Sequence, residues 1–243
     1  DGAIVPLIAE TGGINAMIVD SSALLEQVAD DVLTSAFTSA GQRCSALRLL
    51  FVQEEVADRL IELIAGGMNE LHIGDPSQPS TDVGPVINWS AASKLEDYSK
   101  KLTQKGVTLL KQCDLNQVRT EGSYVAPRMF ELEDARELTS EEFGPILHVV
   151  RYQRDKLKTE VLAAIREAGY GLTLGVHTRI ESVWQEIVAE AAVGNIYINR
   201  NMIGAVVGVQ PFGGEGLSGT GPKAGGPHYL FRFATERTLT VNT

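Results

Sequence analysis

Two short segments of the chain carry side chains that could do covalent chemistry. The first, Gly41-Gln42-Arg43-Cys44-Ser45, lies between an amphipathic stretch and an apolar one, where α/β proteins often place ligand-handling loops. A thiol reacts as the thiolate, and the neighbouring cation Arg43 is expected to favour that form. On local evidence alone, Cys44 fits a buried structural cysteine as well, because free cysteines are common in cores.

The second segment contains a carboxylate beside glycines. Glu10 follows an apolar run and precedes Gly12 and Gly13. Glycines let the backbone approach a ligand closely, and a carboxylate there could act as a general base. Taken alone, the same residues also fit a solvated turn. The roles of Glu10 and Cys44 therefore depend on whether the fold brings them together.

Other motifs that could do chemistry lack the flanking sequence that their function requires. Residues 214–219 have the spelling G-x-G-x-x-G of a dinucleotide fingerprint, but the glycines and prolines that follow cannot continue a helix. Cys113 has no reactive setting, and His148 and His177 stand in strand-like runs typical of a core. The four histidines have no metal-ligand spacing, so no metal site is expected.

The elements that must position these residues alternate between strand and helix. Strands are expected at 16–19, 47–52, 107–110, 146–152, 172–177 and 195–198, and helices at 22–39, 54–63, 90–104, 156–168 and 181–192. This alternation predicts an α/β domain with a largely parallel sheet. Residues 204–227, rich in glycine and proline, are expected to form a loop. Residues 237–243 alternate like a strand that could pair with another chain.

Charge and hydropathy limit the partners. The chain has 21 Lys and Arg against 31 Asp and Glu, a net charge of −10. Nucleic acid is not an expected partner, because phosphate contacts need clustered cations. Apolar runs fall far short of the roughly 20 residues that span a bilayer, so no membrane contact is expected for this segment. The sequence starts with aspartate, and we expect it to be a piece of a longer polypeptide.

Four motifs in order along the chain resemble the aldehyde dehydrogenase superfamily. They are Glu10-Thr11-Gly12-Gly13, Gly41-Gln42-Arg43-Cys44, Glu141-Glu142-Phe143-Gly144-Pro145, and Pro211-Phe212-Gly213-Gly214 with Ser218-Gly219. The resemblance implies a three-layer α/β catalytic domain with a C-terminal extension strand. It divides the chain into the end of an NAD-binding domain (1–13), a catalytic domain (14–208), and a signature loop with an oligomerisation strand (209–243).

Residues 199–214 are similar to the L-glutamate γ-semialdehyde (1-pyrroline-5-carboxylate) dehydrogenases of proline catabolism, including those of the bifunctional proline utilisation enzymes. The likeness implies NAD-dependent oxidation of the aldehyde to L-glutamate through a Cys44 thioester, with Glu10 activating water. It implies substrate contacts from Ser45, Gly204, Ala205 and Phe212, and cofactor contacts from Thr11, Gly12, Glu141 and Phe143.

The resemblance also implies which domain, cellular location and partner chains belong to the parent polypeptide. FAD is expected only in a proline dehydrogenase domain of the parent polypeptide, which is cytoplasmic or peripheral on the inner membrane. A homo-oligomer formed through the C-terminal strand is expected. Without most of an NAD-binding domain, the chain alone is expected to fold but not to turn over aldehyde. The alternatives are an aldehyde dehydrogenase of other specificity, a thiol hydrolase on a similar fold, and a non-catalytic assembly domain.

Overall fold

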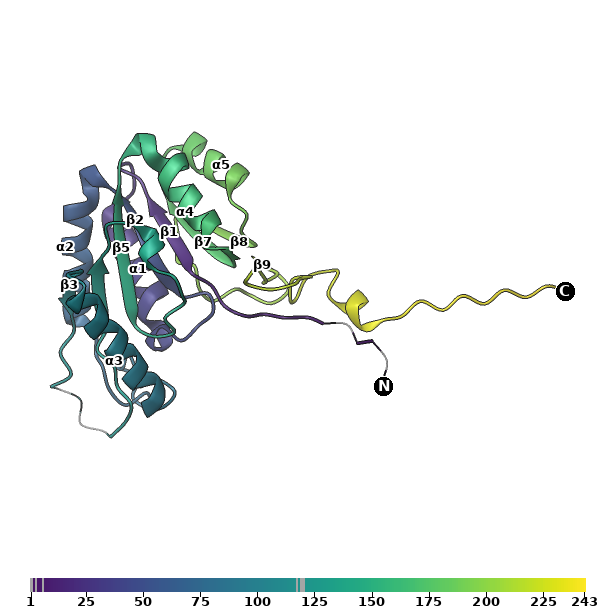
Figure 1. Ribbon diagram of the computed structural model, residues 1–243, viewed down its shortest axis with the longest axis horizontal. Coiled ribbons are helices and arrows are strands. Elements are labelled where there is room, and N and C mark those ends of the chain that lie inside the picture. Colours follow the sequence, from purple (N-terminus) through teal and green to yellow (C-terminus); the bar gives the residue numbers. More distant parts are fainter. Residues whose placement is uncertain (1, 3, 6, 117, 119–120) are drawn as a thin grey trace.

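The computed structural model describes residues 2, 4–5, 7–116, 118 and 121–243. Within the expected 1–13 segment, Asp1, Ala3 and Pro6 therefore lie outside the described residues. The chain forms one α/β body, from which the N-terminal and C-terminal residues extend on the same side (Figure 1). None of the helices in the described part of the chain is both long enough and apolar enough to cross a bilayer.

The centre of the fold is a seven-stranded sheet. Its strands are β1 (Asn15–Val19), β2 (Leu47–Gln53), β3 (Thr108–Gln112), β4 (Arg128–Glu131), β5 (Ile146–Tyr152), β7 (Thr173–His177) and β8 (Asn195–Ile198). Their order is β3-β4-β5-β2-β1-β7-β8, and only β3 is antiparallel to its neighbour. The predicted α/β class with a largely parallel sheet is confirmed.

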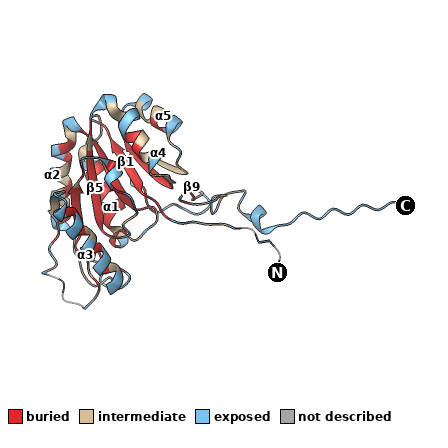
Figure 2. Ribbon diagram, viewed as in Figure 1, coloured by how far each residue is buried: buried red, intermediate tan, exposed pale blue. Residues whose placement is uncertain are grey.

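Alternate strand residues face two helical layers. The helices are α1 (Leu25–Phe37), α2 (Glu54–Glu70), α3 (Trp89–Gln104), α4 (Ala163–Glu167) and α5 (Glu181–Glu190). On β1, Met17 and Val19 pack with α1 and α2, whereas Ala16 and Ile18 pack with the α4 and α5 side. Both faces of the sheet are buried (Figure 2). The strands are therefore almost continuously apolar, as parallel sheets require.

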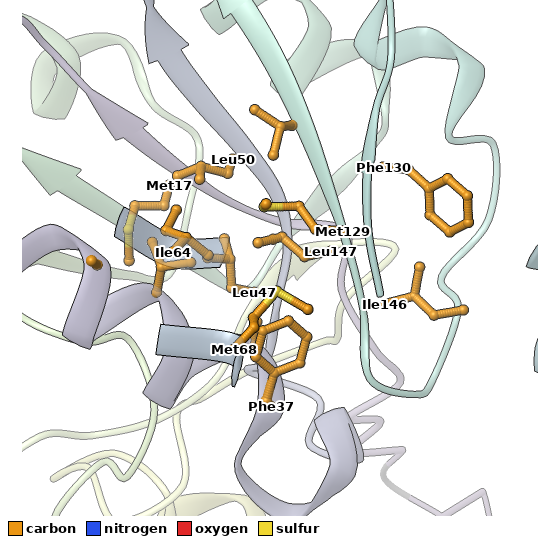
Figure 3. Packing of buried hydrophobic residues seen from close by; sticks show 14 of the residues in the cluster. Met17, Phe37, Leu47, Leu50, Ile64, Met68, Met129, Phe130, Ile146 and Leu147 are labelled. Carbon is orange, nitrogen blue, oxygen red and sulfur yellow. The ribbon is translucent and has the colours of Figure 1, made fainter. Parts of the chain in front are cut away.

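The larger core lies between the sheet and the α1 and α2 layer. Side chains from β1, β2 and α2 meet there, among them Met17, Leu50, Ile64 and Met68 (Figure 3). Burial of such side chains contributes about 1.5–3 kcal/mol each. This layer holds α1 firmly against the strands, and α1 leads directly to the Cys44 segment.

Two local expectations differ from the structure. β4 lies in a stretch that shows no strand pattern, because four residues are too short for a periodicity. The helix expected at 156–168 begins with a π-helical segment, Leu157–Leu162, before α4. Residues 204–227 are mostly loop, as predicted, apart from β9 (Glu215–Gly216), which pairs with β6 (Tyr170–Gly171).

The expected C-terminal strand at 237–243 is not formed. After a 3-10 turn at Leu230–Phe233, the remaining residues have no regular structure and extend away from the body (Figure 1). Leu239 and Val241 are 82% and 71% exposed. A strand needs a neighbour for its backbone hydrogen bonds, and no described segment of this chain supplies one.

Candidate active site

The candidate residues meet at the amino edge of the sheet because each stands just before a parallel strand. Residues 10–13 precede β1, Cys44 precedes β2, and Glu141 precedes β5. These three strands are adjacent and parallel, so their starting points are neighbours. Open α/β sheets usually bind ligands at the opposite, carboxyl edge.

Asn15 fixes the backbone of the Cys44 segment. Its buried side-chain Nδ2 donates to the carbonyl oxygens of Cys44 at 2.6 Å and Ala46 at 2.9 Å, and its Oδ1 accepts from the N–H of Thr173 at 3.2 Å. One amide therefore joins the starts of β1, β2 and β7. Sequence reasoning missed Asn15, although an amide at the start of an apolar strand is a recognisable signal.

Arg48 joins the nucleophile segment to the segment before β5. Its buried guanidinium donates to the carbonyl oxygens of Gly144 at 3.0 Å and Arg43 at 3.2 Å, and contacts Glu141 Oε1 at 3.2 Å. The guanidinium carbon also lies 5.3 Å from the centre of the Phe143 ring. Sequence reasoning missed Arg48 too, although a single cation inside an apolar strand is a recognisable signal.

Glu10 is held by the glycine-rich loop near the end of the chain. It forms an antiparallel bridge with Gly219, and the N–H of Thr11 donates to the carbonyl oxygen of Ser218 at 3.1 Å. A Cβ at Gly213 would come within 3.2 Å of Glu10 Oε1, so glycine leaves room for the carboxylate. Two motifs far apart in the sequence are thereby brought together.

The Cys44 thiol lies in the field of two carboxylates. Burial raises the pKa of Cys44 most, and the charge of Glu141 raises it further. Hydrogen bonds from the main chain at Ser45 and Cys44 lower this pKa, and the charge of Glu10 raises it. Both residues precede adjacent parallel strands, which agrees with an electrostatic interaction between them. Burial also raises the pKa of the Glu10 carboxyl, which makes it a stronger base.

The expectation that Arg43 favours the thiolate is wrong. Its guanidinium Nε donates to the Ser39 hydroxyl at 3.2 Å, and Arg43 is not among the groups that shift the pKa of Cys44. With a raised pKa, the resting thiol is mostly protonated at neutral pH. Cys44 therefore needs a base that removes its proton as it attacks.

The four predicted substrate contacts lie on three segments. Ser45 is buried, and its carbonyl oxygen accepts from the Thr173 hydroxyl at 3.3 Å. Gly204 is exposed with φ +73°, and Ala205 beside it is half-buried, on the loop after β8. Phe212 forms a bridge with Ala224. Among the described residues, no hydrogen bond joins Ser45 to Gly204 or Ala205.

Among the predicted cofactor contacts, Gly12 adjoins the Glu141 carboxylate. Glu141 Oε2 accepts from the N–H of Gly13 at 3.1 Å, and a Cβ at Gly12 would lie 2.3 Å from the same oxygen. Gly12 therefore makes room for Glu141, while the Thr11 hydroxyl donates to the carbonyl oxygen of Leu217. The Phe143 ring is 46% exposed. Thr11 and Phe143 are exposed, Glu141 is half-buried and Gly12 is buried.

The remaining thiol and one buried imidazole are structural. Cys113 Sγ donates to the carbonyl oxygen of Met68 at 3.2 Å, and burial raises its pKa to about 11. Both ring nitrogens of His148 are bonded, to the Tyr98 hydroxyl at 2.8 Å and the Arg48 carbonyl at 3.0 Å. Over the described ranges, no group of three or more His, Cys, Asp or Glu residues could hold a metal ion.

Residues 1–239 match the aldehyde dehydrogenase family, and the chain belongs to that family. The bifunctional protein PutA of Escherichia coli is 55% identical over 240 residues, which are 97% of this chain and 18% of that protein. Crystal structures of PutA, one of them a variant of the Bradyrhizobium japonicum protein, match with a TM-score of 0.94 and 63% identity. The match covers 99% of this chain and 24% of those chains.

A third relative has a nucleotide bound. The 1-pyrroline-5-carboxylate dehydrogenase from Thermus with bound NAD matches with a TM-score of 0.80 and 33% identity, over 93% of this chain and 43% of that one. The resemblance inferred from four motifs is confirmed at the level of the family. The chain spans less than half the length of each of these relatives.

Iodoacetamide should alkylate Cys44 before Cys113, because Cys113 is buried, hydrogen-bonded and has a pKa of about 11. Since the pKa of Cys44 is also raised, its alkylation rate should keep increasing above about pH 8.5, where a free thiol is half ionised. Glu10→Gln removes one of the charges that raise this pKa, so the profile should move to lower pH. Peptide mass spectrometry measures both rates.

The matched control is Glu26→Gln on the exposed side of α1, which should leave the profile of Cys44 unchanged. Equal inertness of both thiols would contradict the prediction and favour the non-catalytic assembly domain. An unchanged profile in Glu10→Gln would show that the carboxylate and the sulfur do not interact.

Proposed function

We propose that this chain is the nucleophile-bearing part of an NAD-dependent L-glutamate γ-semialdehyde dehydrogenase. Cys44 is the nucleophile and Glu10 is the general base. One observation carries the proposal: in a member of the aldehyde dehydrogenase family, the segments of Glu10 and Cys44, which are 34 positions apart, lead into two adjacent parallel strands at one edge of the sheet. The two buried histidines do not favour the thiol hydrolase alternative: both ring nitrogens of His148 are already bonded, and His177 ends β7 at the edge of the sheet opposite Cys44.

Cys44 begins the reaction by attacking the aldehyde carbon. Glu10 takes the proton of the thiol, a sulfur–carbon bond forms, and the π electrons of the carbonyl move to its oxygen. The main-chain groups at Ser45 and Cys44 that already hydrogen-bond the sulfur are placed to stabilise the negative charge that develops beside it. Asn15 keeps this stretch of backbone in position through its bond to the Cys44 carbonyl.

Glu141 and Phe143 are the residues that would hold NAD. Each oxygen of the Glu141 carboxylate accepts one hydrogen bond in the structure and retains a second lone pair, and the Phe143 ring has an exposed surface. The chemistry that NAD supplies when bound is uptake of the two electrons released as the Cys44 adduct becomes a thioester. Once Glu10 has released the thiol proton to solvent, its carboxylate removes a proton from the water that attacks the thioester. The Cys44 sulfur then leaves as the thiolate, which takes up a proton as the acid is released.

The substrate assignment rests on Ser45, Gly204 and Ala205. A carboxylate removed from water needs several donors, and a hydroxyl with two backbone N–H groups can supply them. The φ of +73° and the open space at Gly204 suit a backbone that a ligand approaches closely. Phe212 would pack on the aliphatic part of the substrate. The names of the relatives, PutA and 1-pyrroline-5-carboxylate dehydrogenase, support the same substrate.

The proposal extends to the organisation of the chain. Residues 1–13 end an NAD-binding domain, 14–208 form the catalytic domain, and 209–243 form the signature loop and an oligomerisation segment. The exposed apolar side chains of Leu239 and Val241 support pairing with a second copy. The rest of the longer polypeptide would supply the NAD-binding domain, so the chain alone should form no NADH.

Ser45→Ala in the full-length polypeptide should lower kcat/KM for L-glutamate γ-semialdehyde about tenfold to a hundredfold, because a hydrogen bond to a charged group is lost. Oxidation of propanal, which has no α-carboxylate, should change much less. NADH absorbance measures both reactions, and Ser77→Ala, on an exposed and distant turn, is the control. An equal loss with both aldehydes would contradict the assignment of Ser45, and a wild type that oxidises only propanal would favour another specificity.

A further inference from the structure

The loop after β8 has to cross from one edge of the sheet to the other. It begins at Asn199, at the carboxyl edge, whereas Cys44 lies at the amino edge. By Gly213, the chain is back at the amino edge, where its N–H donates to Asn195 Oδ1 at the start of β8. Asn199 starts this return with φ +53°, an uncommon value for a residue other than glycine. Contacts with neighbouring elements must therefore hold the loop along this path.

A polar stripe on α1 follows the first part of the return. Gln27 Nε2 donates to the carbonyl oxygen of Asn199 at 2.7 Å. One turn later lies Asp31, where burial raises the pKa of the carboxyl and the neighbouring main chain and side chain of Asn201 lower it. Two turns after Gln27, the buried Ser35 hydroxyl accepts from the N–H of Met202 at 3.1 Å.

The spacing of these contacts shows that the helix and the loop run side by side. Gln27, Asp31 and Ser35 are four residues apart, so they lie on one face of α1. α1 itself runs from the carboxyl edge to the amino edge, because it connects the parallel strands β1 and β2. Successive loop residues therefore meet successive turns of α1 on the way to the Cys44 end.

The end of β7 and the residue after it also contact the start of the loop. The Asn199 side chain bonds both the N–H of Thr178 at 3.0 Å and its carbonyl oxygen at 2.9 Å. Burial lowers the pKa of the His177 imidazole to about 4, the neighbouring main chain of Arg200 raises it, and ring Nε2 lies 3.6 Å from Asp31 Oδ2. These contacts make the start of the loop over-determined, which explains how the unusual φ at Asn199 is maintained.

We infer that Gln27, Asp31 and Ser35 are positioning residues that set the path of residues 199–205 and so place Gly204 and Ala205 for the amino-acid end of the substrate. The inference rests on the proposed function of Gly204 and Ala205. The same helix ends just before the Cys44 segment, so one rigid element fixes both the nucleophile and the substrate loop. None of the three side chains needs to touch the substrate.

Kinetics of the full-length polypeptide test the inference. Ser35→Ala should raise KM for L-glutamate γ-semialdehyde about tenfold, while kcat for propanal stays within about twofold of wild type. Thr34→Ala removes a hydroxyl from the exposed face of the same turn and should change neither value. Gln27→Ala, at an exposed position that folding tolerates, should act like Ser35→Ala, with Glu26→Ala as its control. An equal fall in kcat/KM for both aldehydes would overturn the inference. So would an unchanged KM for L-glutamate γ-semialdehyde in both Ser35→Ala and Gln27→Ala.

Hydrogen exchange tests the contacts without any substrate. Amides of residues 199–205 should exchange about tenfold faster in Ser35→Ala than in Thr34→Ala, while β1 exchanges equally in both. Equal exchange of the loop in the two variants would overturn the inference. If wild type fails to oxidise L-glutamate γ-semialdehyde but the loop exchange differs as expected, the proposed substrate is wrong and the guiding role of α1 is supported.

Discussion

Cys44→Ala in the full-length polypeptide should reduce aldehyde oxidation by at least about 10,000-fold, because no other group can form the covalent adduct. The loss should be the same for L-glutamate γ-semialdehyde and for propanal, because oxidation of either aldehyde requires the bond to sulfur. Steady-state NADH formation measures the change. The variant should still bind the dinucleotide, because Glu141 and Phe143 are unchanged. Fluorescence of the dinucleotide measures this binding.

Cys113→Ala is the matched control for this experiment. The Cys113 thiol is buried, donates to the carbonyl oxygen of Met68, and is far along the chain from the candidate site. The variant should therefore lose some stability and keep its rate of aldehyde oxidation. If Cys44→Ala retained more than about a hundredth of the wild-type rate, Cys44 would not be the nucleophile. The carboxylate chemistry assigned to Glu10 would then have no thioester to act on.

Arg48→Met should lower the free energy of unfolding of the chain by about 3–5 kcal/mol, because it leaves the carboxylate of Glu141, which is 13% exposed, without its buried cation. The carbonyl oxygens of Arg43 and Gly144 would also lose their donor. Urea titration followed by far-UV circular dichroism measures the change. Adding Glu141→Gln should restore part of the stability, since the uncompensated charge is then removed.

Arg59→Met provides the comparison for Arg48. Arg59 also pairs with a carboxylate, Glu62, but both side chains are largely exposed, and the change should be below about 0.5 kcal/mol. A similar small effect for Arg48→Met would mean that the guanidinium does not organise the site. Additive effects of Arg48→Met and Glu141→Gln would lead to the same conclusion.

The sequence was sufficient for most of the fold because the hydrophobic periods are clear. Leu25, Val28, Val32 and Ala36 mark one face of α1, and β5 has the bounds that its apolar run predicted. β4 and the antiparallel pairing of β3 were not predictable in this way. They depend on contacts between segments, which a local period does not encode.

The site was predictable as residue types and less so as geometry. Cys44 and Glu10 stood out by their glycine-rich neighbours, but the side-chain direction of Arg43 was not encoded by its position next to the thiol. Asn15 and Arg48 act through partners as far as 158 and 96 positions away. On α1, Gln27 and Asp31 have the pattern of an ordinary solvated face until the loop after β8 is placed against them.

The pairing that holds Glu10 joins residues from opposite ends of the chain. Ala9 and Thr11 bond Thr220 and Leu217, which are 211 and 206 positions away, whereas Asn15 reaches the Cys44 segment across only 29. During synthesis, the bond between Asn15 and the Cys44 segment can therefore form long before residues 217–220, which hold Glu10, have been made. A product that ends before residue 217 would therefore carry the Cys44 segment without the partner that positions its base.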